Sequence, residues 1–251
     1  MSEQSSRRDH DEFSGQVAVV SGGGSGIGRA AALALASRGA ALYLLGRDSE
    51  RLQKVREEVG ANGKLTRCYP IDLTRDSDVE ELQQRVRNDF GAVDILIHSA
   101  GIISLGGVGS APIADFDRQY RTNVRAVYLL TQTMLPLLKE RRGQIVFFNS
   151  TAGLTANANA AQYSAAKHAI KAIADSLREE VNPAGLRVLT VYIGRTATPM
   201  QETVHSIEGK TYRPERLLQP EDVTSVVLNA LSLPRTAEVT EITIRPLTKP
   251  L

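Results

Sequence analysis

Residues 16–28 read QVAVVSGGGSGIG, an apolar run rich in valine that passes directly into a glycine-rich segment. The run predicts a strand buried on both faces, and the alanine-rich stretch after it, from Gly26 to Arg38, predicts a helix. A glycine-rich turn between strand and helix lets the backbone approach a pyrophosphate, which the N–H groups at the helix start can bind. Although most glycine-rich turns only reverse the chain, this context favours dinucleotide binding.

Strand-like and helix-like segments alternate along the rest of the chain. Further strands are predicted at 41–46, 65–70, 95–98, 144–149, 187–192 and 239–244, with helices at about 48–59, 74–90, 113–140, 161–181 and 221–231. This alternation predicts right-handed crossovers and a parallel sheet. We predict an α/β single-domain Rossmann fold over 15–251, with a doubly wound parallel sheet of about seven strands flanked by helices.

Two segments fall outside this alternation. Residues 1–14 are polar and charged and are predicted to form a disordered N-terminal tail. Residues 195–219 are polar and show no period, and we predict a mobile flap that closes over the substrate.

The composition is that of an ordinary globular protein, with 42% hydrophobic residues, 23% charged residues and a net charge of +2. No basic stripe is interleaved with aromatic residues, so nucleic acid is not an expected partner. No apolar run approaches the roughly 20 residues of a membrane span. The single cysteine, Cys68, lies in an apolar run and is expected to be an inert buried thiol in a reducing, cytoplasmic setting. No metal site is predicted.

The strongest chemical signal is YSAAK, from Tyr163 to Lys167, near the start of a predicted helix. A spacing of four places both side chains on one helical face. An ammonium group near a phenol lowers the phenol pKa from about 10 toward the range useful for acid–base catalysis. A lone Y-x-x-x-K is often only a packed tyrosine beside a solvated lysine. Here Ser150 ends a predicted buried strand upstream, and Asn123 lies within the long predicted helix.

These motifs resemble those of the short-chain dehydrogenases/reductases over residues 16–244. Ser21 with Gly22, Gly26 and Gly28 is similar to the family's T-G-x-x-x-G-I-G turn. The order Asn123, Ser150, Tyr163, Lys167 is similar to its catalytic set. The resemblance implies an NAD(P)-dependent oxidoreductase with Tyr163 as general acid/base, Ser150 orienting the substrate oxygen, Lys167 lowering the tyrosine pKa and binding the nicotinamide ribose, and Asn123 anchoring a water. It also implies a homo-oligomer, a tetramer or dimer, formed through the helices at 113–140 and 161–181.

The resemblance further implies a set of cofactor-binding positions besides Tyr163 and Lys167. They are Ser21, Gly22, Gly24, Ser25, Gly26, Ile27, Arg47, Asp72, Leu73, Ala100, Gly101, Ile193, Gly194, Thr196 and Thr198. The chain departs from the family where HSAG (98–101) replaces N-N-A-G, and where Ile193 replaces the proline of P-G-x-x-x-T. His98 is expected to be a hydrogen-bonded structural residue.

The end of the second predicted strand bears on the choice of cofactor. Gly46 stands where members selective for NAD carry an aspartate, and Arg47 follows it. A guanidinium can hold a 2′-phosphate by two charge-assisted hydrogen bonds, which favours NADP over NAD. Arg47 as a mere surface charge, with the neighbouring Asp48, leaves NAD open.

The segments flanking the candidate site, 102–107 and 151–162, are small and uncharged and favour a small neutral carbonyl compound or its secondary alcohol. Arg195 could bind a carboxylate, so an NAD-dependent alcohol or hydroxy-acid dehydrogenase remains an alternative. A non-catalytic nicotinamide-binding sensor is a further alternative, although such proteins tend to lose the tyrosine or lysine.

Overall fold

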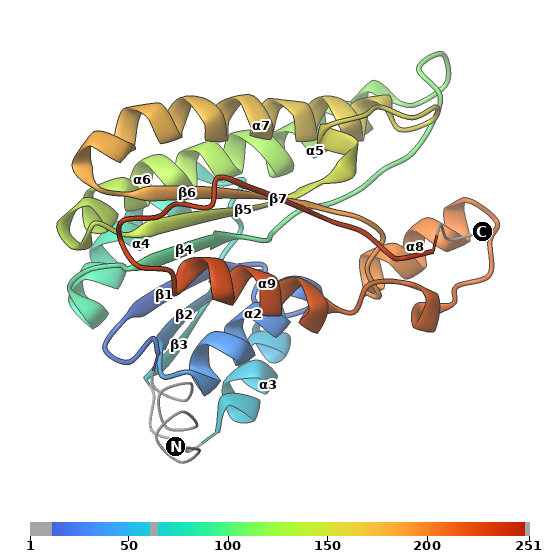
Figure 1. Ribbon diagram of the computed structural model, residues 1–251. Helices are drawn as coiled ribbons and strands as arrows, with labels where there is room; N and C mark the ends of the chain where they lie inside the picture. The colour runs from blue at the N-terminus through green and yellow to red at the C-terminus, as the bar shows by residue number, and fades with distance from the viewer. Residues whose placement is uncertain (1–11, 61–64, 249–251) are drawn as a thin grey trace.

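The computed structural model describes residues 12–60 and 65–248, in which all the strands join one parallel sheet (Figure 1). The sheet has seven strands in the order β3-β2-β1-β4-β5-β6-β7. Their bounds are β1 (Val17–Ser21), β2 (Ala41–Gly46), β3 (Thr66–Pro70), β4 (Ile95–His98), β5 (Gln144–Ser150), β6 (Arg187–Ile193) and β7 (Glu241–Ile244). The predicted α/β Rossmann architecture is confirmed.

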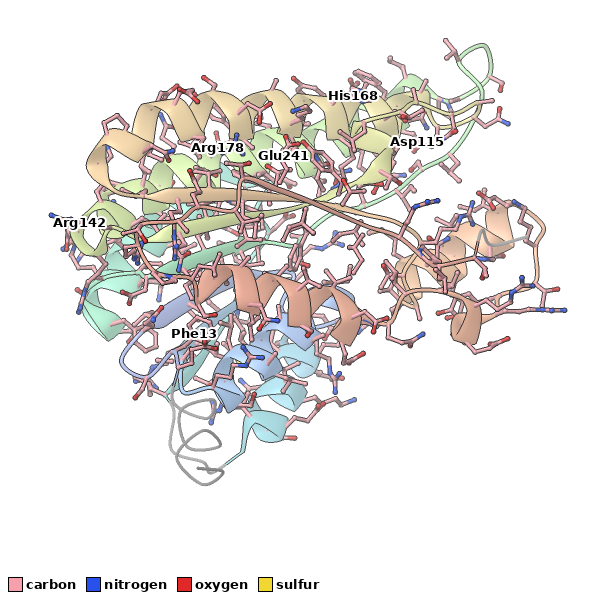
Figure 2. The ribbon with its side chains drawn as sticks, viewed as in Figure 1. Phe13, Asp115, Arg142, His168, Arg178 and Glu241 are labelled. Carbon is pink, nitrogen blue, oxygen red and sulfur yellow. The ribbon has the colours of Figure 1, made fainter. Side chains whose placement is uncertain are left out.

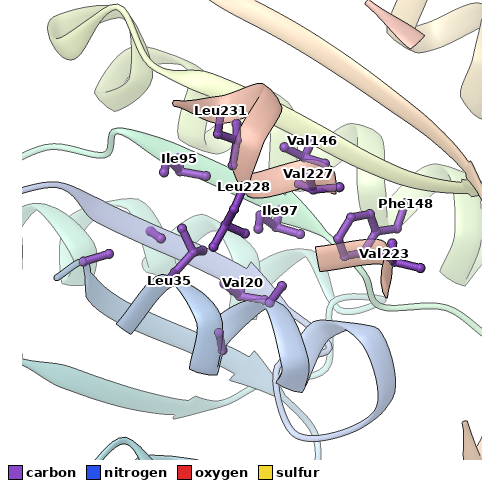
Figure 3. Packing of buried hydrophobic residues seen from close by; sticks show 14 of the residues in the cluster. Val20, Leu35, Ile95, Ile97, Val146, Phe148, Val223, Val227, Leu228 and Leu231 are labelled. Atoms are coloured by element: carbon purple, nitrogen blue, oxygen red, sulfur yellow. The ribbon is translucent and has the colours of Figure 1, made fainter. Parts of the chain in front are cut away.

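Helices cover both faces of the sheet because its strands are apolar on both sides. One face carries α2 (Gly26–Ser37), α3 (Ser49–Val59) and α9 (Pro220–Leu231). The other carries α4 (Asp76–Phe90), α6 (Ala126–Arg141) and α7 (Ala161–Val181). Successive residues of β1 serve the two layers: Val20 packs beneath α2 and α9, and Val19 packs on the opposite side. Figure 3 shows the first cluster, in which Leu228 of α9 lies near Val20 and Leu35.

The order in which strands are added to the sheet changes direction at β1. This strand pairs with β2 on one side and with β4 on the other. The connections that leave β1 and β4 therefore diverge to opposite faces. In open parallel sheets this switch point opens a crevice at the carboxyl ends of the strands, where ligands bind.

The long helix predicted over 113–140 is divided into three parts. It consists of α5 (Ile113–Tyr120), a π-helical turn η1 (Arg121–Arg125) and α6. The Ala126 N–H bonds to the Arg121 carbonyl, five residues back, so one extra residue is accommodated without breaking the helix. The extra residue changes which side chains face inward, and Asn123 is among the buried ones.

The expectation of an aperiodic flap over 195–219 is wrong in part. This segment contains α8 (Pro199–Ile207) and a short 3₁₀ turn at Pro214–Arg216. The Thr198 hydroxyl accepts the Gln201 N–H at 3.3 Å, and Pro199 occupies the first helical turn, where its missing N–H costs nothing. These local capping signals outweigh the polar composition of the segment.

The ordered chain also begins earlier than predicted. Phe13, within the expected tail of residues 1–14, is 1% exposed and packs in the first core cluster (Figure 2). Its N–H donates to the Arg38 carbonyl at 2.8 Å, at the end of α2. Residues 1–11 of that predicted tail lie outside the described residues.

Within the described ranges, none of the helices combines the length and the apolar character needed to cross a membrane.

Candidate active site

The glycine-rich turn between β1 and α2 brings two backbone segments together. Gly22 has a φ of +67°, and a Cβ at this position would lie 2.8 Å from the Ala100 nitrogen, in the loop after β4. A Cβ at Gly28 would overlap the Gly22 carbonyl oxygen. Both positions require glycine because the turn, the first turn of α2 and the loop after β4 pack backbone against backbone.

Ser21 ends β1 and is 1% exposed. Its hydroxyl donates to the Ile97 carbonyl at 3.2 Å and accepts the N–H groups of Ser99 and Ala100 at 3.1 and 3.3 Å. Its side chain fastens β1 to the loop after β4 and does not line the cleft. The prediction that Ser21 contacts the cofactor is therefore corrected: full use of its hydroxyl within the protein leaves it a supporting role.

One cleft of about 2170 Å³ opens at the carboxyl ends of the strands. It is lined by Ser150, Tyr163 and Lys167 together with Gly22, Gly24, Ser25, Gly26, Ile27, Arg47, Asp72, Leu73, Ala100, Gly101, Ile193, Gly194, Thr196 and Thr198. Of the predicted site residues, Ser21 and Asn123 alone are outside this lining. The cleft thus joins the glycine-rich turn to the Tyr–Lys pair, although these lie far apart in the sequence.

The Tyr–Lys pair and Ser150 are held by two adjacent elements. Tyr163 and Lys167 lie one turn apart at the start of α7, and Ser150 ends β5, where its hydroxyl accepts the Ala152 N–H at 3.1 Å. Asn149 connects the two elements: its amide donates to the Lys167 carbonyl at 3.0 Å, and its oxygen accepts the Ser150 N–H at 2.9 Å. Sequence reasoning missed Asn149, whose only signal is its place before Ser150.

Burial moves the pKa values of the pair in opposite directions. Burial raises the pKa of Tyr163, and a polar contact with Ser150 offsets part of that rise. Burial lowers the pKa of Lys167 to about 8. Its Nζ donates to the Phe148 carbonyl at 3.2 Å and lies 5.8 Å from the centre of the Tyr163 ring. Burial of the phenol sets the direction of this pKa shift, and the expected lowering of the Tyr163 pKa by Lys167 stays a prediction. Tyr163 therefore keeps its proton at neutral pH.

Asn123 supports the site through a loop. Its oxygen accepts the Ile102 N–H at 2.9 Å and its amide donates to the Ile102 carbonyl at 2.8 Å. The side-chain amide thus bonds to both backbone groups of Ile102, as a residue of a neighbouring strand would. This geometry shows a loop-positioning contact for Asn123; the predicted water-anchoring role stays a prediction.

Two further amides hold the same loop, and sequence reasoning missed both. Gln119, which is fully buried, accepts the Ser104 N–H at 3.0 Å and donates to the Ser104 carbonyl at 3.2 Å. Gln162, beside Tyr163, donates to the same carbonyl at 3.2 Å. The signal that could have found them is a glutamine on the helix face that is turned toward the protein core.

A profile of the short chain dehydrogenase family matches residues 16–209. The chain belongs to this family. An uncharacterized oxidoreductase of Staphylococcus epidermidis (strain ATCC 35984) is 32% identical over 232 residues, which are 92% of this chain and 97% of that protein.

Two solved structures are similar over nearly the whole chain. An alcohol dehydrogenase from the archaeon Thermococcus sibiricus, complexed with 5-hydroxy-NADP, has a TM-score of 0.85 and 26% identity, and covers 94% of this chain and 99% of its own. An NAD⁺-bound xylitol dehydrogenase has a TM-score of 0.85 and 27% identity, and covers 93% and 99%.

In this short-chain dehydrogenase the far end of the cleft, beyond β2 and β3, carries charged groups. Arg47 is exposed there, and Arg51, which sequence reasoning missed, lines the cleft beside it. Asp48 caps α3 by accepting the Arg51 N–H at 3.0 Å, and it also pairs with the Arg51 guanidinium at 3.1 Å. Hydrogen bonds from Thr74, chiefly from its backbone N–H, lower the pKa of Asp72, which is therefore ionised at neutral pH.

The opposite end of the cleft is closed by α8, and its charges are paired. The Arg195 guanidinium lies 2.6 Å from Glu208, and the Lys210 ammonium lies 3.2 Å from the other oxygen of the same carboxylate. These ion pairs connect the end of β6 to the end of α8. Arg195 is therefore already matched by a carboxylate of the protein.

His98 departs from the family pattern and is buried at the end of β4, with a ring stacked on Phe147 at 4.8 Å between centroids. Its Nε2 lies 2.9 Å from the Thr131 hydroxyl, which donates its own proton to the Val127 carbonyl at 2.8 Å. His98 must therefore be the donor in the first bond. Burial lowers the pKa of His98 to about 3, so the ring is neutral, as expected of a structural residue.

Proposed function

We propose that this chain is an NADP(H)-dependent oxidoreductase that interconverts a neutral carbonyl compound and its secondary alcohol, with Tyr163 as general acid/base. The observation that carries the proposal is that one cleft is lined both by Ser150, Tyr163 and Lys167 and by the glycine-rich turn before α2. The family's oxidoreductase chemistry and the NADP- and NAD⁺-bound neighbours support a nicotinamide cofactor.

The cleft fits such a cofactor. The turn from Gly22 to Ile27 presents backbone N–H groups at the start of α2, where a pyrophosphate is stabilised by the helix dipole. Glycine at positions 22 and 28 allows the turn, α2 and the loop after β4 to pack closely enough to form this site. Lys167 lines the same cleft and would hold the nicotinamide ribose.

Each residue of the site has its own role in the proposed reaction. The bound cofactor supplies hydride, two electrons with one proton, to the carbonyl carbon in reduction and takes it back in oxidation. Tyr163 gives its phenolic proton to the carbonyl oxygen, and that oxygen accepts a hydrogen bond from Ser150. Lys167, as the ammonium, stabilises the phenolate that this transfer leaves behind. Since burial favours the neutral phenol, the protein is prepared for reduction at neutral pH.

The groups around Arg47 support NADP over NAD. The Asp48 carboxylate is occupied by the cap of α3 and by Arg51, which weakens its capacity to bind ribose hydroxyls or repel a phosphate. Arg47 is exposed at the cleft and available to pair with a 2′-phosphate.

The Arg47→Ala variant should bind NADPH about tenfold or more weakly, because the 2′-phosphate loses its cation, and its affinity for NADH should be unchanged. Cofactor fluorescence measures both affinities. Tighter binding of NADH by the unaltered protein would overturn the preference.

The state of Arg195 supports a neutral substrate. Arg195 was the group expected to bind a substrate carboxylate, and it is paired with Glu208 at 2.6 Å. We therefore rank the hydroxy-acid alternative below a neutral ketone.

The decisive test is the Tyr163→Phe variant, which removes only the phenolic hydroxyl. NADPH-dependent reduction of a panel of ketones should fall at least a hundredfold, while NADPH affinity stays within about twofold. Tyr69→Phe, which removes a hydroxyl from a partly exposed tyrosine of β3 outside the cleft lining, is the matched control. Unchanged turnover in Tyr163→Phe would overturn the mechanism, and cofactor binding without turnover on any carbonyl would favour the sensor.

A further inference from the structure

The substrate end of the cleft has apolar side chains on one face of α8. Met200, Val204 and Ile207 are spaced by four and three residues, so they share one helical face, and all three line the cleft. Met200 is 39% exposed and Ile207 is 52% exposed. Figure 1 shows α8 beyond the carboxyl ends of the strands, apart from the helices that cover the sheet.

A second apolar wall of the cleft is the segment after Gly101. Ile102, Ile103 and Leu105 line the same cleft and are partly exposed. The backbone of this wall is fixed, because Asn123 holds Ile102 at both its N–H and its carbonyl. Gln119 holds Ser104 in the same way. A wall fixed by buried amides keeps its apolar side chains at the cleft.

Three charged groups meet at the end of α8 and line the edge of the cleft. Glu208 forms ion pairs with Arg195 and Lys210, and these contacts lower its pKa although burial of the carboxylate opposes the shift. A ligand here meets hydrocarbon from α8 and from the 102–105 segment, with this ion cluster at the edge.

We propose that the substrate is a ketone, or the matching secondary alcohol, whose carbonyl carbon carries an unbranched hydrocarbon chain of several carbons seated between α8 and the 102–105 wall. This inference rests on the proposed function and names its substrate class. It differs from the expectation of a small substrate, because a chain that extends past the reacting carbon would cover the exposed side chains of Met200 and Ile207.

The experiment is a homologous series of 2-butanone, 2-hexanone and 2-octanone with NADPH and the full chain. Each methylene buried should raise kcat/KM about threefold to fourfold until the slot is filled. In Ile207→Asn the ratio of kcat/KM for 2-octanone to that for 2-butanone should fall about tenfold. Leu65→Asn is the matched control, since Leu65 is 44% exposed at the far end of β3 and outside the cleft lining, and it should behave as the unaltered protein. A kcat/KM that is flat or falls with chain length would overturn the inference.

Calorimetric binding of the same ketones separates this inference from the proposed function. Affinity that rises with chain length and falls in Ile207→Asn supports the slot even where turnover is absent, and only the proposed function then fails. Turnover with affinity independent of chain length leaves the proposed function standing and overturns the slot.

Discussion

Tyr163 and Lys167 line one cleft, and burial moves their pKa values in opposite directions. Burial raises the pKa of Tyr163 and lowers that of Lys167 to about 8. The phenol therefore keeps its proton while the ammonium is being lost. Reductive catalysis by this pair needs both protons: one to transfer to the substrate and one to stabilise the phenolate.

We therefore predict that kcat/KM for ketone reduction is level from about pH 6 to 7 and falls with an apparent pKa near 8. The initial rate of NADPH oxidation measured between pH 6 and 10 tests this, with NADPH affinity measured in parallel. Activity that stays level to pH 9.5 would contradict a role for the Lys167 ammonium.

His98 makes stability depend on pH. Its pKa is about 3 in the folded chain and about 6.5 when unfolded, so the unfolded chain binds more protons between these values. Stability from this group is fully present above about pH 6.5 and is lost as pH falls, by up to about 1.4 kcal/mol per pH unit.

We predict that the His98→Asn variant loses less of its free energy of unfolding between pH 7 and pH 5 than the unaltered chain. Denaturant unfolding at the two pH values measures the difference. His168→Asn, on the exposed surface of α7 (Figure 2), is the control and should retain the full dependence. An identical pH dependence in His98→Asn and in the unaltered chain would contradict this role.

At the scale of elements, the π-helical turn η1 and the helix before it hold the loop that walls the substrate end. Gln119 on α5 and Asn123 in η1 bond to the backbone of residues 102–104, and Gln162 adds a third amide from α7. These contacts connect the helix that carries Tyr163 to the substrate wall. Without Gln119 and Gln162, the N–H and the carbonyl of Ser104 lose the side-chain partners that these two residues provide.

We predict that Gln119→Leu, which preserves volume, raises KM for the ketone about tenfold and leaves NADPH affinity unchanged. The variant should also lose about 1–3 kcal/mol of stability, since buried backbone groups remain unsatisfied. Gln83→Leu removes a comparable side chain-to-backbone bond from α4, to the Thr133 carbonyl, far from the loop and is the control. An equal effect on KM in both variants would mean that Gln119 has no specific positioning role.

At the scale of the whole molecule, an apolar stripe faces outward on the helices predicted to mediate assembly. Ile113, Phe116 and Tyr120 of α5 and Tyr128 of α6 are 74%, 37%, 45% and 55% exposed. The rings of Phe116 and Tyr120 stack at 6.1 Å between centroids. A contiguous exposed apolar stripe of this kind marks an interaction surface.

We predict a homo-oligomer, a tetramer or dimer, that uses this stripe. Tyr128→Glu should shift the sedimentation coefficient toward that of a monomer, because it places a charge in a desolvated contact. Leu65→Glu changes an exposed leucine elsewhere and should leave assembly unchanged. A monomeric unaltered protein would contradict the prediction.

The order of strands and helices, the parallel sheet and the Tyr163–Lys167 spacing were all readable from the sequence. The reason is that they depend on local periodicity and on short motifs. The structure brings Ser150, Tyr163 and Lys167 to the cleft that also holds Gly22 and Arg47, which the alternation of elements implied.

Other features depended on residues distant in the sequence. Ser21 turned out to bind the loop after β4, Phe13 to belong to the core, and Gln119 to hold Ser104. The shift in the pKa of Tyr163 follows from burial, which no spacing of tyrosine and lysine encodes. Local sequence determined which elements form and in what order. Only tertiary packing decided which polar groups are consumed inside the protein and which remain at the cleft, because desolvation and hydrogen bonding are properties of the folded surroundings.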